Sequence, residues 1–236
     1  MNILHTTYQA LYQTGLITLS LLMVALFAQS CSPYDTKEVT SFGDKANIQL
    51  PDGSFVGLNA GSTLRYNAAD FKEKRIVALE GEGHFTVRRG GGFLCETDYG
   101  LVRVLGTQFN VYTRPDGFEV SCYLGKVEVR NQGEIIELNM NEKAIWQEDH
   151  FEKIPEYSEK PRWVIGESVF QEARYSSVLD ELERQYNLEV KTEITGNPPF
   201  TGSFPHDNLQ EAMDKVVDPY GYRYEQKEQE IRIWEP

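Results

Sequence analysis

Short runs of alternating apolar and polar residues fill the chain from residue 46 to residue 146. The clearest run covers residues 101–111, where apolar side chains alternate on both sides of Gly106. A period of two is typical of strands with one buried face, and a Gly inside such a run favours a bend. We therefore expect residues 104–111 to form a Gly-bent core strand with a structural role.

Gly, Pro and Asp residues separate these runs at short intervals. Turn chemistry of this kind occurs at residues 51–54, 59–62, 81–83, 90–92, 98–100, 115–117 and 131–133. Short strands at such spacing predict an all-β wound or sandwich-like domain over residues 45–150. Within it we expect separate strands over residues 75–80 and 84–88, joined by a turn at 81–83, and no helix.

The pattern changes after residue 150. Residues 151–162 lack periodicity and are predicted to form a linker. Residues 163–236 then show two stretches with apolar side chains three and four positions apart, around Leu182 and Met213, each flanked by strand-like runs. This order predicts a small α+β domain with the element sequence βαββαββ.

An uncharged apolar run at residues 16–28 precedes the β domain. It is shorter than the roughly 20 residues of a spanning helix and matches the core of a secretion signal. Gln29 and the small residue Ser30 lie between this run and Cys31. We expect residues 1–31 to be a signal or membrane anchor and residues 32–44 a polar tether. A lipidated Cys31, an uncleaved membrane helix and an ordinary cleaved signal all remain open, and each would place the bulk of the chain in the cell envelope.

The net charge of the chain limits the classes of partner that it can bind. Acidic residues outnumber basic ones 36 to 23, giving a formal charge of −13. This excludes a nucleic-acid binder, which needs a basic surface to neutralise phosphates, and disfavours broad docking on anionic lipid.

The four His residues are scattered without ligand spacing, so we expect no metal site and no cofactor. Glu80 and Glu82 are too close for an inverting acid pair, and we interpret them as turn-edge charges. No enzymatic activity is expected.

Cys95 and Cys122 form an even pair once Cys31 is set aside. In an oxidising compartment such a pair is a candidate disulfide, but each residue also lies in an apolar strand pattern where a small buried thiol fits. Both interpretations stay open.

The ordered motifs of residues 45–146 resemble the FecR-type periplasmic sensors of iron uptake signalling. The matching pieces are Leu50-Pro51-Asp52-Gly53-Ser54, Leu58-Asn59-Ala60-Gly61-Ser62, Leu64-Arg65-Tyr66, Leu79-Glu80-Gly81-Glu82, Val104-Leu105-Gly106-Thr107, Phe109-Asn110-Val111 and Gly125-Lys126-Val127. Leu182-Glu183-Arg184-Gln185-Tyr186 and Thr201-Gly202-Ser203-Phe204 resemble the C-terminal domain of Bacteroidetes members. That domain is similar to the short N-terminal domain of secretins and TonB-dependent receptors.

The resemblance implies a membrane-anchored anti-sigma regulator that takes part in transcription regulation. Its periplasmic part would sense the signalling domain of a TonB-dependent outer-membrane receptor, and a cytoplasmic segment would contact an extracytoplasmic-function sigma factor. Only residues 1–15 precede the apolar run here, too few to bind a sigma factor. Either the protein starts further upstream than Met1, or it is an exported form that has lost direct sigma-factor contact. The alternative is an exported lipoprotein that acts as a binding module without sigma-factor contact. In the resemblance, Cys95 and Cys122 both replace aliphatic strand residues, which would suit a bridge.

Partner binding is expected at sheet edges of the C-terminal domain, where unpaired backbone groups accept an added strand. The candidate partner-binding residues are Phe200, Thr201, Gly202, Ser203, Phe204, Ile231, Ile233 and Trp234.

Overall fold

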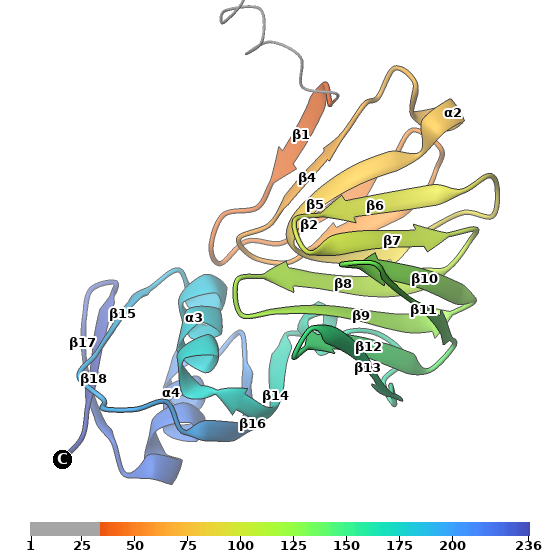
Figure 1. The fold of residues 1–236 in the computed structure, drawn as a ribbon. Helices are drawn as coiled ribbons and strands as arrows, with labels where there is room; N and C mark the ends of the chain where they lie inside the picture. The colour runs from red at the N-terminus through yellow and green to blue at the C-terminus, as the bar shows by residue number, and fades with distance from the viewer. Residues whose placement is uncertain (1–33) are drawn as a thin grey trace, which may run out of the picture. The chain divides into compact units, whose positions relative to one another are not determined.

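The computed structural model describes residues 34–236 (Figure 1). Thr36–Pro236 forms one compact unit. The expected anchor at residues 1–31, with Cys31, lies outside the described residues. Between residues 34 and 236, no helix is long and apolar enough to cross a membrane.

The N-terminal two-thirds of this unit is a β domain of two layers that share one long strand. The first layer contains β1 (Thr36–Val39), β4 (Thr63–Tyr66), the first half of β5 (Ile76–Thr86), β6 (Phe93–Thr97), β7 (Gly100–Val104), β10 (Lys126–Asn131) and β11 (Glu134–Asn139). The second contains β2 (Ala46–Gln49), β3 (Phe55–Leu58), the second half of β5, β8 (Gln108–Arg114), β9 (Gly117–Leu124), β12 (Glu142–Gln147) and β13 (His150–Pro155). The predicted wound, sandwich-like β fold is confirmed.

The strand β5 joins the layers because it bends near Gly81. Its first half pairs with β4 and β6, and its second half with β3 and β8. Gly81 has φ of +95°, and a Cβ there would lie 2.5 Å from Ser62 Oγ. Only Gly fits this conformation and this close approach without strain. The predicted turn at residues 81–83 is therefore wrong, because the chain passes through it as one continuous strand.

Residues 104–111 were predicted to form one bent strand, but a turn divides them between two strands. Strand β7 ends at Val104 in the first layer, and β8 begins at Gln108 in the second. Gly106, with φ of +151°, lies in the turn between the layers, where a Cβ would come within 2.7 Å of the Arg89 backbone. Alternation continues across this turn because both strands present apolar side chains to the same core.

Aromatic and aliphatic side chains fill the space between the layers. Phe85 and Phe109, opposite each other on β5 and β8, stack with ring centroids 4.8 Å apart. Phe93 meets Phe85 edge-on at 6.1 Å. All three are fully buried, and each such side chain contributes about 1.5–3 kcal/mol by leaving water.

Three segments differ from the sequence-based expectation. Residues 36–39 of the predicted tether form β1, because alternate side chains of this segment are half-buried against β4. Residues 151–155 of the predicted linker belong to β13, where Phe151 packs on Trp146 of β12 with ring centroids 4.7 Å apart. A short helix, α2 (Phe71–Lys74), buries Phe71 in a stretch where no helix was expected.

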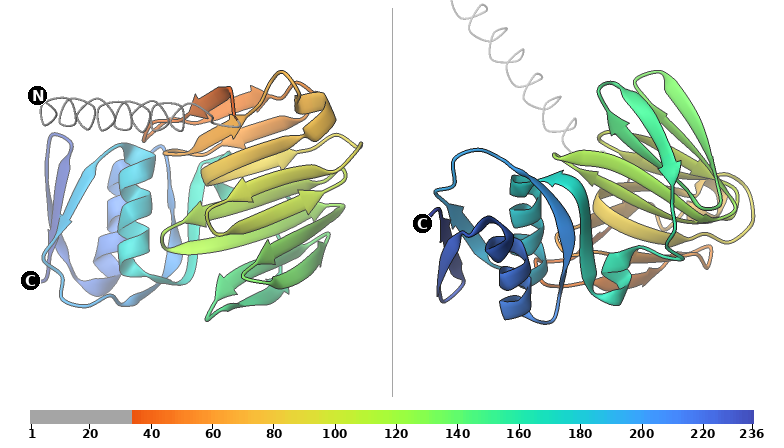
Figure 2. Two further views of the ribbon diagram at one scale, coloured as in Figure 1. Left: turned by 45° about the horizontal axis from the view of Figure 1, so that its top comes forward. Right: turned by 90° about the horizontal axis from the view of Figure 1, so that it is seen from below.

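The C-terminal third has the predicted βαββαββ order. Its elements are η1 (Arg162–Ile165), β14 (Glu167–Arg174), α3 (Tyr175–Tyr186), β15 (Glu189–Thr192), β16 (Pro199–Pro205), α4 (Leu209–Val217), η2 (Asp218–Tyr220), β17 (Arg223–Lys227) and β18 (Glu230–Trp234). Strands β15, β18 and β17 form one sheet, and β14 and β16 form another. Figures 1 and 2 show α3 and α4 against one face of the three-stranded sheet. Apolar residues of both helices share a buried core with Ile231 and Ile233.

The bend of β5 gives a direct test of the fold. We expect Gly81→Ala to lower the free energy of unfolding by about 3 kcal/mol, because it adds a clash with Ser62 to an unfavourable φ. Gly91→Ala is the matched control, since a Cβ at Gly91 has no atom within 4 Å. Urea unfolding followed by circular dichroism measures both. Equal stability of the two variants would contradict the role of Gly81.

Candidate functional site

The strand β18 offers no free edge for a partner. It lies between β15, to which it is parallel, and β17, to which it is antiparallel. Ile231 and Ile233 are fully buried under the helices. Strand addition at residues 231–234, one of the two predicted docking modes, is therefore wrong: both backbone edges of β18 are already paired.

The strand β16 keeps one open edge. Among the described residues it pairs only with β14. Phe200 and Phe204 are buried, so they hold the strand in place and are not available to a partner. Thr201 is exposed, and its hydroxyl accepts a hydrogen bond from the Glu172 amide at 2.9 Å. What β16 presents is a row of backbone groups.

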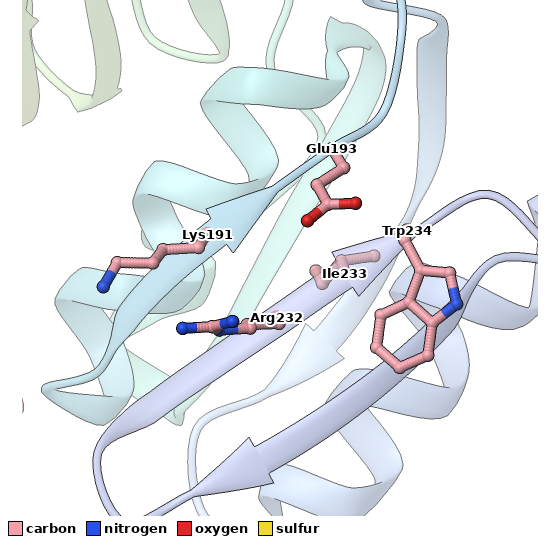
Figure 3. Close-up of a pocket in the computed structure, with 5 residues that line it drawn as sticks. All are labelled: Lys191, Glu193, Arg232, Ile233 and Trp234. Carbon is pink, nitrogen blue, oxygen red and sulfur yellow. The ribbon is translucent and has the colours of Figure 1, made fainter.

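The outer face of the three-stranded sheet carries a shallow hollow of about 440 Å³ (Figure 3). It is lined by Lys191, Glu193, Arg232, Ile233 and Trp234. Trp234 is half-buried on this face beside Arg232, so of the predicted residues of β18 it is the one that can touch a partner. Arg232 is bonded to Glu230 at 2.7 Å, and Lys191 also pairs with Glu230. The hollow thus combines one aromatic side chain with largely neutralised charges.

A buried polar network connects the β domain to α3. The Glu82 carboxylate accepts hydrogen bonds from Asn59 Nδ2 and Asn110 Nδ2, both at 2.8 Å. From α3, Gln185 Nε2 donates to Asn59 Oδ1 at 2.9 Å and to Glu181 Oε1 at 2.8 Å. Two carboxylates on different parts of the fold are thereby linked through amide side chains.

Electrostatics in this network are unfavourable to charge on Glu82. Burial and the nearby negative charge of Glu181 raise the pKa of Glu82 to about 7, and the bonds from Asn59 and Asn110 only partly offset this. Glu181 is held differently, because Arg184 Nε donates to its carboxylate at 2.9 Å. The arrangement therefore pairs one acid with a guanidinium and brings the other, Glu82, to the edge of protonation at neutral pH.

A second line of contacts crosses the same junction through His206. Lys45 Nζ lies 2.7 Å from His206 Nδ1, and His206 Nε2 lies 2.9 Å from Ser168 Oγ. Because Lys can only donate, Nδ1 accepts and Nε2 carries the proton. The Ser168 hydroxyl then donates to Glu181 at 3.0 Å. Burial and the charge of Lys45 lower the pKa of His206 to about 4, so the ring is neutral at pH 7.

Comparison with known proteins accounts for this two-part arrangement. The FecR protein family model matches residues 36–128, and the FecR C-terminal model matches residues 167–233. Two crystal structures from Parabacteroides distasonis ATCC 8503, each described as a candidate anti-sigma factor, are 30% identical to the chain. They superpose with TM-scores of 0.79 and 0.78, covering 85% of this chain and 99% of theirs. The chain belongs to the FecR family. The comparison with curated proteins gave no match.

In this FecR-family protein the polar junction joins the two matched regions. Asn59, Glu82 and Asn110 come from the FecR region, and Glu181 and Gln185 from the FecR C-terminal region. Sequence reasoning missed the junction and placed Glu82 at a turn edge. Glu80 does behave as a surface charge, pairing with Arg65 at 2.7 Å. Glu82 lies on the outward face of β5 as well, but α3 covers that face. The sequence carries no local signal for the junction, because Asn59, Asn110 and Gln185 are far apart along the chain.

The two strand cysteines are free and buried, so the candidate bridge is not present. Cys95 faces the core between Val77 and Val102 of the neighbouring strands. Cys122 Sγ donates to the Gly125 carbonyl at 3.6 Å. Burial raises the pKa of both thiols, to about 11 for Cys122. Each occupies its own place in the strand pattern as a small apolar side chain.

Within residues 34–236 there is also no group of three or more His, Cys, Asp or Glu residues placed to hold a metal ion.

The pKa of Glu82 predicts a pH-dependent stability. A carboxyl that binds its proton more tightly when folded lowers the free energy of unfolding as pH rises from about 4.5 to about 7, by about 3 kcal/mol in total. His206 acts in the opposite direction between about pH 4 and 6.5, because its folded pKa is lowered. We therefore expect the difference in stability between wild type and Glu82→Gln to change by this amount over pH 4.5–7.5. Urea titrations at each pH measure it, and a constant difference would contradict the assignment.

The burial of the thiols predicts their reactivity. In the folded protein, without reductant, we expect a maleimide reagent to leave Cys95 and Cys122 unmodified, because both are fully buried. After unfolding in guanidinium, still without reductant, both should be labelled. Peptide mass spectrometry locates the label. Labelling after unfolding that requires a reductant would show that a bridge forms.

Proposed function

We propose that this protein is an envelope-anchored sensor and anti-sigma regulator. The observation that carries the proposal is the likeness of nearly the whole described chain, in both its parts, to structures described as candidate anti-sigma factors. The apolar run at residues 16–28 supplies the anchor, and the part from β1 onward lies in the periplasm.

The partner is the signalling domain of a TonB-dependent outer-membrane receptor, and it docks on the C-terminal part. Support comes from the open backbone edge of β16, which offers unpaired hydrogen-bonding groups to an added strand. The hollow beside Trp234 is a second contact surface on the same part of the fold. Iron uptake is the process that such a receptor serves in the family.

The junction at Glu82 supplies the connection between this input and the rest of the chain. Its links are side-chain hydrogen bonds, each of which contributes about 0.5–1.5 kcal/mol. A partner that shifts α3 by a small amount changes the environment of Glu82 directly. The alternative function, an exported binding module without sigma-factor contact, shares the same docking surface and differs only in its output.

Docking at the β16 edge is tested by one substitution. A Lys on an edge strand opposes strand addition, so Thr201→Lys should weaken binding of the receptor's signalling domain about tenfold. The matched control is Thr192→Lys on β15. The Thr192 hydroxyl is also exposed and accepts a hydrogen bond from a backbone amide, that of Ile194. Isothermal titration calorimetry gives both dissociation constants.

Deleting residues 163–236 provides the coarser test. Binding should be lost while the β domain keeps its cooperative unfolding transition. Binding that survives this deletion, or that Thr201→Lys leaves unchanged while Thr192→Lys weakens it, would refute docking at β16.

A further inference from the structure

Four loops of the β domain gather at one end of the two layers. Arg75, at the start of β5, ties them together: it donates to Asp52 at 2.8 Å, to the Arg88 carbonyl at 2.7 Å and to the Gly91 carbonyl. The Gly90 amide donates to the Leu105 carbonyl at 3.1 Å. Residues 51–54, 88–92 and 105–107 are therefore neighbours, and Thr107 Oγ1 adds the β9–β10 turn by donating to the Lys126 carbonyl at 2.9 Å.

This end exposes large apolar side chains, which we call the loop-end patch: Phe55, Leu105, Leu124 and Met140. Their exposed fractions are 52%, 65%, 52% and 52%. Phe55 and Leu124 lie on one cross-strand row of the second layer, which runs through Thr86 and Gln108. Met140 follows Asn139, which pairs with Lys126 beside the β9–β10 turn. Single exposed apolar residues need no explanation, but four at one end indicate an interaction surface.

Cations without a carboxylate partner surround the loop-end patch. They are exposed and, among the described residues, none of them has an ion pair: Lys72, Arg88, Arg89, Arg103 and Lys126. Of the acids nearby, Asp52 pairs with Arg75 and Asp70 with Lys74, while Glu73 on α2 and Glu137 on β11 are exposed and have no ion pair among the described residues. In a chain of net charge −13, this end is locally positive.

The chain enters the β domain at this same end. Thr36, the first residue of β1, pairs with Tyr66, which pairs with Val77, two residues after Arg75. Residues 29–35 separate β1 from the apolar run at 16–28. Seven residues span at most about 25 Å when fully extended. The chain between residue 28 and Thr36 therefore limits the distance of Thr36, at the loop end, from the lipid surface to about 25 Å.

We propose that the loop end is a docking surface for the anionic lipid headgroups of the membrane in which residues 16–28 are anchored. The proposal rests on the envelope anchoring proposed above. Apolar side chains flanked by Lys and Arg are the combination that binds the interface of an anionic bilayer. The acidic remainder of the molecule is repelled from the same surface, so the two effects orient the protein in one direction.

The test uses the full chain reconstituted by detergent removal into vesicles of phosphatidylcholine, alone or mixed with phosphatidylglycerol. Flotation reports membrane association, and hydrogen exchange read by mass spectrometry reports contact of the loops. We expect residues 88–92, 105–107 and 124–126 to exchange several-fold more slowly on the anionic vesicles than on the neutral ones. The protection should disappear in 1 M salt, where the Debye length falls to about 3 Å.

The double variant Arg89→Gln, Lys126→Gln should lose most of this protection. Lys160→Gln, Arg223→Gln is the matched control, since both cations are exposed, lack an ion pair and lie outside the loop end. Flotation on both vesicle types without protection of the loops overturns the lipid surface and leaves anchoring intact. Flotation on anionic vesicles alone, with protection, supports the surface and refutes the anchor. Failure to float on either overturns both.

Discussion

The arrangement of the β domain depends on the bend of β5 at Gly81. This one strand pairs with four others, two in each layer, and within residues 34–236 no other strand contributes to both layers. The bend requires a backbone at positive φ, with Ser62 in the space that a Cβ of residue 81 would occupy. Bending also brings the two ends of β5 together, so that Arg75 before the strand can bond the Arg88 carbonyl after it. The loop end is a consequence of this bend.

The bend also sets the position of Glu82, one residue further on. A regular strand would place this carboxylate on a solvent-facing surface, as it does Glu80. Here the outward face of the second half of β5 meets α3, and Glu82 is buried with Glu181 nearby. Burying a carboxylate is costly, and an apolar residue at such a position is often equally stable or more so. Retaining the acid gives the junction a dependence on pH and on the exact position of α3 that an apolar contact lacks.

The sequence predicted the type of most secondary-structure elements, but not which strands pair with one another. Period-two and period-3.6 patterns are local, so most strands, the helices α3 and α4 and the βαββαββ order followed from them. Gly81 and Gly106 show the limit. Both interrupt an apolar run, yet Gly81 lies inside one strand and Gly106 between two, because the outcome depends on which strands pair on each side. The short β1 and β13 were missed for the same reason: each becomes a strand only through its partner, β4 or β12.

The candidate site was harder still to predict. Residues 200–204 and 231–234 were chosen as edge strands, but β18 lies inside its sheet because β15 joins it in parallel after a helix. The junction uses ordinary polar residues, Asn59 and Gln185, 126 positions apart. Neither has a local signature of function. Only the packing of α3 on β5 gives them one.

The strand β1 connects the two ends of the β domain. It begins at the loop end with Thr36, opposite Tyr66, and leads to Thr40, whose hydroxyl donates to the Asn59 carbonyl at 2.6 Å. Three residues after Thr40, the Gly43 amide donates a hydrogen bond to the Arg184 carbonyl of α3 at 2.7 Å. A four-residue edge strand is held by few backbone bonds, so it is among the least stable parts of a sheet. Any displacement of α3 acts on the residues that follow β1, and any pull from the N-terminal side acts on β1 itself. The segment that begins the β domain, β1 with the residues after it, is therefore also the segment that contacts α3 of the C-terminal part.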